Sequence, residues 1–131
     1  MRLLFSSLLS SVGLLAAVPG FAHHSFATQY DANKPVTLQG TVTKVEWMNP
    51  HARFYLDVKD ADGNTESWNL ELASPNVLKR NGWSSKSLQV GDSIKVEGSA
   101  ARDGSKMANA RVVTLKDGKR VFGRSSGDAL N

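Results

Sequence analysis

The clearest structural signal is at residues 52–72, which read ARFYLDVKDADGNTESWNLEL. On either side of a central turn, apolar residues recur at every second position: Phe54, Leu56 and Val58, then Trp68, Leu70 and Leu72. A period of two predicts two strands, at residues 52–59 and 66–72, each with one buried and one wet face. The DADG sequence at residues 60–63 predicts the turn of a hairpin between them.

A longer strand is predicted upstream, at residues 36–47, which read VTLQGTVTKVEW. Its apolar positions fall on one phase up to Val42 and on the other phase from Val45 onwards. A change of phase within a strand indicates a β-bulge or a strong bend, here near Lys44. Gly40 in the interior of the strand is consistent with the same coiling.

After the hairpin the pattern changes from strand to helix. Ser74 suits the N-cap of a helix, Pro75 its first position and Gly82 the residue that ends it. Two further strands are predicted beyond this short helix, at residues 93–98 and 107–115. A short return is possible at residues 121–122.

Three strands, one short helix and two strands predict an all-β fold, a small five-stranded OB-like barrel with its helix between strands three and four. A small open β-sandwich is the alternative. We expect an N-terminal arm at residues 23–35, the barrel domain at 36–122 and a flexible tail at 123–131. In an OB barrel the binding loops would lie at residues 48–51 and 100–106.

The first 22 residues have the pattern of a cleaved secretory signal. Arg2 supplies a positive charge, residues 3–18 are largely apolar, and small residues precede a predicted cut after Ala22. The apolar segment is short for a membrane helix and several serines interrupt it. We therefore expect a periplasmic or secreted protein with no membrane span after cleavage.

The composition excludes several classes of site. The 131 residues contain no cysteine, which excludes disulfides, thiolate metal sites, blue-copper centres and cysteine catalysis. The formal charge is +4, and removal of residues 1–22 takes away one basic residue and leaves +3. This excess is mild and the sequence contains no run of five or more like charges, so we expect no nucleic-acid partner.

The three histidines are the strongest candidates for chemistry. Cleavage after Ala22 would give His23 both a free amine and an imidazole, which together form a six-membered chelate on one cation. His24 adds its ring or its backbone amide, and His51 could complete the site from the body of the domain. Nitrogen donors without thiolate favour Cu(II), and after it Ni(II) or Zn(II). A metal site at His23, His24 and His51 is thus predicted, with copper as the possible cofactor.

Other readings of the sequence stay open. In one alternative the histidines bind nothing, and the domain is a protein-interaction or small-ligand module that uses Asn49, Arg53 and Tyr55. The partner would then be an unknown periplasmic molecule. A third possibility is a copper redox enzyme, although no nucleophile motif, phosphate loop or HExxH sequence is present. We expect no catalytic residue.

Two further groups of residues have ordinary explanations. The three tryptophans could form a stacking platform, but rings on inward phases more often belong to a core. Glu46 and Glu71 could form an acid pair, but nothing in their spacing brings them together. We expect these carboxylates on solvated strand faces.

The sequence resembles a family of small exported bacterial proteins of unknown function. Five segments carry the resemblance: HHSFATQYD from residue 23, KPVTLQGTV from 34, VEWMNPHARFYLDV from 45, SPNVLKRNGW from 74 and VGDSIKVEGSAARDGS from 90. The resemblance covers almost all of residues 23–115 and implies a small periplasmic β-barrel. It also implies that His23, His24 and the NPH sequence at residues 49–51 occupy motif positions.

Overall fold

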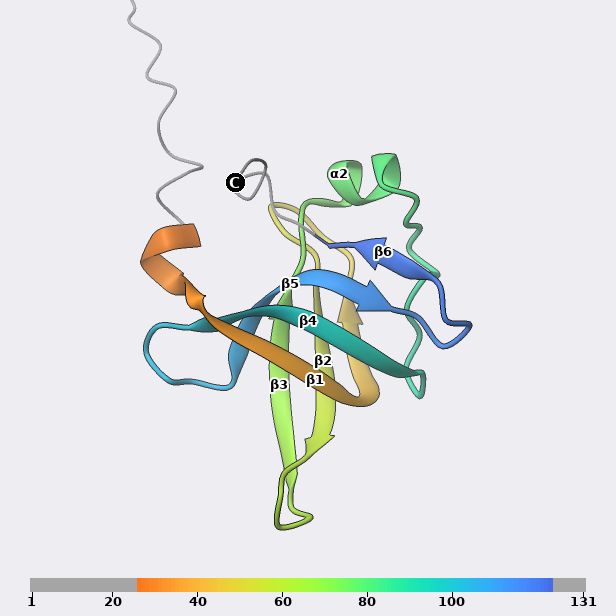
Figure 1. The fold of residues 1–131 in the computed structure, drawn as a ribbon. Coiled ribbons are helices and arrows are strands. Elements are labelled where there is room, and N and C mark those ends of the chain that lie inside the picture. The colour runs from red at the N-terminus through yellow and green to blue at the C-terminus, as the bar shows by residue number, and fades with distance from the viewer. Residues whose placement is uncertain (1–25, 124–131) are drawn as a thin grey trace, which may run out of the picture.

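The structure, a computed structural model, describes residues 26–123 (Figure 1). A helical turn at residues 26–29 precedes six strands and one short helix. In chain order these are β1 (Tyr30–Glu46), β2 (Arg53–Lys59), β3 (Thr65–Glu71), α2 (Pro75–Arg80), β4 (Ser93–Ala101), β5 (Met107–Thr114) and β6 (Arg120–Phe122). The all-β class and the short helix between the third and fourth strands are confirmed.

The strands form one sheet in the order β3-β2-β1-β4-β5-β6, and neighbours in this order are antiparallel. In addition β3 pairs with β5 in parallel, so each of β1 to β5 is hydrogen-bonded to a strand on both sides. The predicted number of five strands is wrong, because β6 adds a sixth. A turn closed by the hydrogen bond from Leu115 N to Lys119 O returns the chain, and Val121 of β6 is buried.

The predicted irregularity of the first strand is present in β1. Its register against β2 shifts between Val42 and Lys44, where the phase of the apolar residues changes. Gly40 lies where β1 and β2 approach closely, and a Cβ there would be 2.1 Å from the carbonyl oxygen of Asp57. No side chain fits at that distance, so a glycine is required at this bend.

Strand β1 begins earlier than the sequence pattern predicts. It starts at Tyr30, within the predicted arm, because Tyr30 pairs with Ala101 of β4. The tyrosine side chain is only 1% exposed. The segment at residues 31–34 that follows is mostly exposed, which is why it has no strand-like alternation. Part of the predicted arm therefore belongs to the folded domain.

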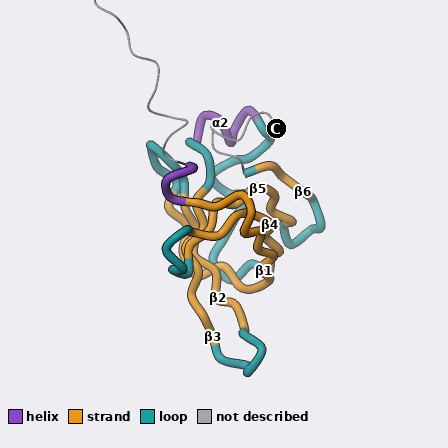
Figure 2. Tube along the Cα trace, turned by 60° about the vertical axis from the view of Figure 1, so that its left-hand side comes forward, coloured by secondary structure: helices purple, strands orange, loops and turns teal. Residues whose placement is uncertain are grey.

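Helix α2 has the predicted boundaries. The Ser74 hydroxyl accepts a hydrogen bond from Val77 N, Pro75 is at the first turn, and Gly82 has a positive φ of 89° just after the C-cap. Leu78 anchors the helix in the core and is fully buried. In both views α2 lies at the opposite end of the molecule from the β2–β3 turn (Figures 1 and 2).

The core is built from the inward positions of the strands and from α2. Five of the six predicted inward residues of the central hairpin are buried: Phe54, Leu56, Trp68, Leu70 and Leu72. The sixth, Val58, is partly buried against them. Trp83 is also buried, and its Nε1 donates to the carbonyl of Phe122 in β6. The rings of Trp68 and Trp83 thus belong to the core and form no exposed platform.

Candidate ligand and metal site

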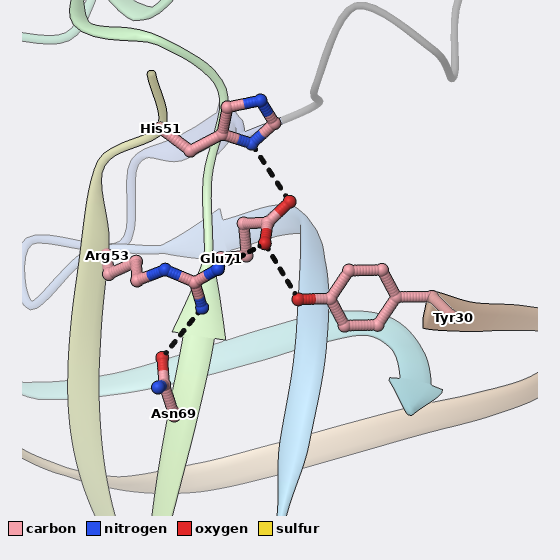
Figure 3. Close-up of polar contacts among 5 residues, drawn as sticks. All are labelled: Tyr30, His51, Arg53, Asn69 and Glu71. Carbon is pink, nitrogen blue, oxygen red and sulfur yellow. Dashed lines mark hydrogen bonds and ion pairs between the residues drawn. The ribbon is translucent and has the colours of Figure 1, made fainter. Parts of the chain in front are cut away.

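His51 lies in the connection between β1 and β2, directly before Ala52, whose backbone N–H and C=O are both hydrogen-bonded. Ala52 donates to the carbonyl of Ala73 and accepts from Leu72 N, which holds this connection against the end of β3. The His51 side chain is 31% exposed, and its Nδ1 is 2.9 Å from Oε1 of Glu71 (Figure 3). The histidine is therefore held in one orientation while one side of the ring remains open.

Glu71 is the centre of this polar group. Its Oε2 accepts from Arg53 Nη2 at 2.6 Å and from the Tyr30 hydroxyl at 2.9 Å (Figure 3). The residue is 6% exposed, so the expectation that it lies on a solvated strand face is wrong. Burial of a carboxylate is costly without partners, and the charge of Arg53 together with three polar contacts offsets that cost.

The strand register explains why these side chains meet. Arg53 of β2 is directly opposite Glu71 of β3, and cross-strand neighbours on one face are close enough to pair. Arg53 also donates from Nη1 to Asn69, which fixes the guanidinium. His51 is two residues before Arg53 and so approaches from the same side. Tyr30 approaches from the start of β1, 41 residues before Glu71.

The Tyr30 hydroxyl is a hydrogen-bond donor in this group. Burial raises the pKa of Tyr30 well above its ordinary value, and the negative charge of Glu71 raises it further. The hydroxyl therefore keeps its proton and donates a hydrogen bond to the carboxylate.

Glu71 determines which nitrogen of His51 can bind a ligand. A carboxylate accepts hydrogen bonds, so a neutral imidazole paired with it through Nδ1 carries its proton on that nitrogen. The other nitrogen, Nε2, then has a free lone pair, and it points away from Glu71 (Figure 3). A histidine whose one ring nitrogen donates to a carboxylate is typical of metal ligands.

A pocket of about 450 Å³ adjoins this group. Glu71 and His51 contribute to its wall, together with Gln29, Glu46, Met48, Asn49 and Arg53. Three predicted site residues, Asn49, His51 and Arg53, are thus brought together. Glu46 and Glu71 border the same pocket although their spacing did not predict it.

The other predicted site residues lie elsewhere. Tyr55 projects from β2 with its ring 5.2 Å from Nζ of Lys44 and does not line the pocket. His23 and His24 lie outside the described residues. Within residues 26–123, no three side chains among His, Asp, Glu and Cys are grouped to hold a metal ion. A metal bound at His51 would need other donors.

Sequence reasoning missed Tyr30, Glu71 and Gln29 around this pocket, and it placed Met48 in a binding loop without giving it a role. Glu71 could have been found from the hairpin register, since a turn at residues 60–63 places Arg53 opposite it. Tyr30 gives no such signal, because its burial depends on contacts with β3 and β4 that are distant in sequence.

Comparisons with known proteins give a family and one structural neighbour. The model of a family of unknown function, DUF6152, matches residues 12–110, and the chain belongs to this family. No curated protein matches the sequence. Among solved structures, the chain is similar to the mitochondrial single-stranded DNA binding protein Rim1 of S. cerevisiae, with 15% identity and a TM-score of 0.48. The alignment covers 63% of this chain and 93% of that one.

None of the helical segments within residues 26–123 has the length and apolar character needed to cross a membrane.

Proposed function

We propose that this member of the DUF6152 family is an exported, non-enzymatic binding domain that takes Cu(II) at His51 together with a mature N-terminus at His23. The observation that carries the proposal is the 2.9 Å contact between His51 Nδ1 and Glu71 Oε1. This contact leaves Nε2 as the donor atom next to the pocket.

The surroundings of Glu71 favour a ligand role for His51. Arg53 and Tyr30 hold the carboxylate in place, so the imidazole needs no reorganisation to meet a metal ion. A carboxylate behind a histidine also makes the ring a better donor. Imidazole suits copper, and Cu(II) stands highest in affinity among the divalent first-row metals.

The path of the chain supports a contribution from the N-terminus. Gln29 lines the same pocket as His51, and the next residue, Tyr30, is bonded to Glu71. Gln29 is six positions after His23. Residues 26–29 form a helical turn that rises about 1.5 Å per residue, and the three positions from His23 to Phe26 would add up to about 10 Å if extended. An amine and imidazole at His23, with His24 or its amide, would then be within reach of the His51 ring.

The proposal includes the finer description of the fold as an OB-like barrel with β6 appended. Its support is the pairing of β3 with β5 and the position of α2 between β3 and β4. In such barrels the loop between the first two strands is a common binding loop, and His51 lies in that loop here.

A pair of protein samples tests the proposal. One begins at His23, and the other carries a single extra residue before it, which removes the chelating amine. Mass spectrometry of the protein from its native host first establishes where the mature chain begins. We expect Cu(II) to bind the first sample tightly and the second at least tenfold more weakly, a loss within the range for metal sites. Equal weak binding by both samples would reject the chelate.

A small-ligand module without metal is the second candidate. The observation that favours it is the pocket of about 450 Å³, a size within the range of small-molecule sites. The amides of Gln29 and Asn49 could orient a polar ligand there. In that case metal-free protein would be isolated with a small molecule visible by native mass spectrometry, and Cu(II) would bind equally weakly with and without the extra residue.

A further inference from the structure

Met48 is a large apolar residue whose exposed position is not explained by packing in the core. Its side chain is 54% exposed, one of three large apolar residues with this degree of exposure in the described part of the chain. A methionine normally contributes to stability by filling space in a core. At Met48 little apolar surface is removed from water, so we looked for another use of the side chain.

Met48 lines the same pocket as His51. The two residues are three positions apart in the short connection between β1 and β2, and both border the one space. His51 is fixed by Glu71, whereas the methionine has three rotatable bonds and can adjust the position of its sulfur. A rigid nitrogen donor and an adaptable sulfur donor therefore face a common volume.

The combination of donors selects a particular metal ion. Thioether sulfur is a soft ligand that favours Cu(I), whereas imidazole serves both oxidation states of copper. Both ligands are uncharged, and Cu(I) accepts low coordination numbers. The carboxylates that border the pocket are already paired, Glu46 with Lys44 at 2.6 Å and Glu71 with Arg53.

We propose that the pocket is a Cu(I) site in which Met48 Sδ and His51 Nε2 are the protein ligands. The inference deepens the proposed function by adding a second oxidation state of the same metal. It shares His51 with the Cu(II) site but does not need the amine of His23.

This difference allows a separate test. The sample with an extra residue before His23 lacks the N-terminal chelate but keeps the pocket. It is titrated without oxygen, with ascorbate as reductant and with bicinchoninate as a coloured competitor for Cu(I). We expect the protein to withdraw one equivalent of Cu(I) from the competitor.

Leucine substitutions identify the sulfur ligand. Met48→Leu keeps an apolar side chain of similar size, and Met107→Leu is the matched control because Met107 belongs to β5 and does not line the pocket. Met48→Leu should weaken Cu(I) binding by at least about tenfold. This is the smallest loss usual when a residue that supports a metal ligand is removed. Met107→Leu should change neither Cu(I) nor Cu(II) binding.

Equal Cu(I) affinity of Met48→Leu and the parent protein would overturn the inference. So would an equal loss in Met48→Leu and Met107→Leu. A measurement on the parent protein adds an independent check, since the NMR signal of the Met48 methyl group should shift when Ag(I), a redox-inert substitute for Cu(I), is added. An unmoved Met48 signal would also contradict the site.

The two proposals can fail separately. Cu(I) binding that depends on Met48, without a Cu(II) effect of the extra residue, would reject the N-terminal chelate and retain the Cu(I) site. The opposite result would reject the Cu(I) site and leave the proposed function intact.

Discussion

The Tyr30 hydroxyl donates to Oε2 of Glu71 over 2.9 Å, while Oε1 of the same carboxylate contacts His51. One buried carboxylate thus holds both the start of β1 and the imidazole that faces the pocket. If the N-terminal residues join His51 on a metal ion, Glu71 connects the two parts of the site. Tyr30 would then be a positioning residue that never touches the metal.

Tyr30→Phe should lower the stability of the fold and weaken Cu(II) binding. The substitution removes one of the donors to a buried charged acceptor, and such hydrogen bonds contribute about 1.5–3 kcal/mol. Urea unfolding measures the first effect and copper titration the second. Tyr55→Phe is the control, because Tyr55 does not contact Glu71 and should be near neutral in both measurements. Equal effects of the two substitutions would show that the hydroxyl of Tyr30 has no special part.

Alkaline pH should destabilise the protein through Tyr30. The pKa of Tyr30 is raised on folding from its ordinary value of about 10, so above that pH the unfolded chain has lost a proton that the folded chain retains. The contribution of Tyr30 is therefore fully present below about pH 10 and declines as the pH rises towards its folded pKa.

Urea unfolding between about pH 9 and 11 measures this decline, around the ordinary tyrosine pKa. Other titrating groups affect the parent protein and Tyr30→Phe alike, so the parent should lose stability more steeply than the variant. Parallel pH profiles would argue against a raised pKa for this hydroxyl.

Glu71→Gln should lower the free energy of unfolding much more than removal of a surface charge from the same strand does. It leaves the guanidinium of Arg53 without its buried partner, and breaking a buried pair costs about 3–5 kcal/mol. Glu66→Gln is the matched control, since Glu66 is also in β3 but pairs with Lys106 at a more exposed position. An exposed pair contributes about 0–1 kcal/mol. Similar losses of unfolding free energy in both variants would contradict the central position of Glu71.

Trp68→Ala should destabilise the fold by about 3–5 kcal/mol, the usual range for a large core aromatic residue. Trp68 is 9% exposed and belongs to the main hydrophobic cluster. Thermal unfolding measures the loss, and Cu(II) titration below the melting temperature should show little change because Trp68 does not line the pocket. An unchanged melting temperature would mean that the ring adds little to the core.

The elements that follow local rules were predictable from the sequence. The alternation in β2 and β3, the Ser74 cap of α2 and the bulge near Lys44 all depend on residues close together in the chain. Strand β6 was hard to predict as a full element, because three residues are too few to show a period.

The site was predictable only in part, because its central residue is buried by distant segments. Period-two reasoning correctly puts Glu71 on the face opposite to Leu70 and Leu72, and that face is ordinarily wet. Arg53 and Tyr30 cover it there, and Tyr30 arrives from a segment with no strand-like pattern. The proximity of His51, Arg53 and Asn49 could be predicted because each belongs to the predicted hairpin or to the loop before it.

The most direct test of the account is the electron paramagnetic resonance spectrum of Cu(II) bound to protein that begins at His23, compared with the same protein carrying His51→Gln. We predict that the parent spectrum shows nitrogen couplings from His51 in addition to those of the N-terminal residue. His51→Gln should remove the couplings from His51. Circular dichroism should show that the fold of this variant is intact. Identical copper spectra from the two proteins would mean that the imidazole held by Glu71 is not a ligand, and would contradict the account.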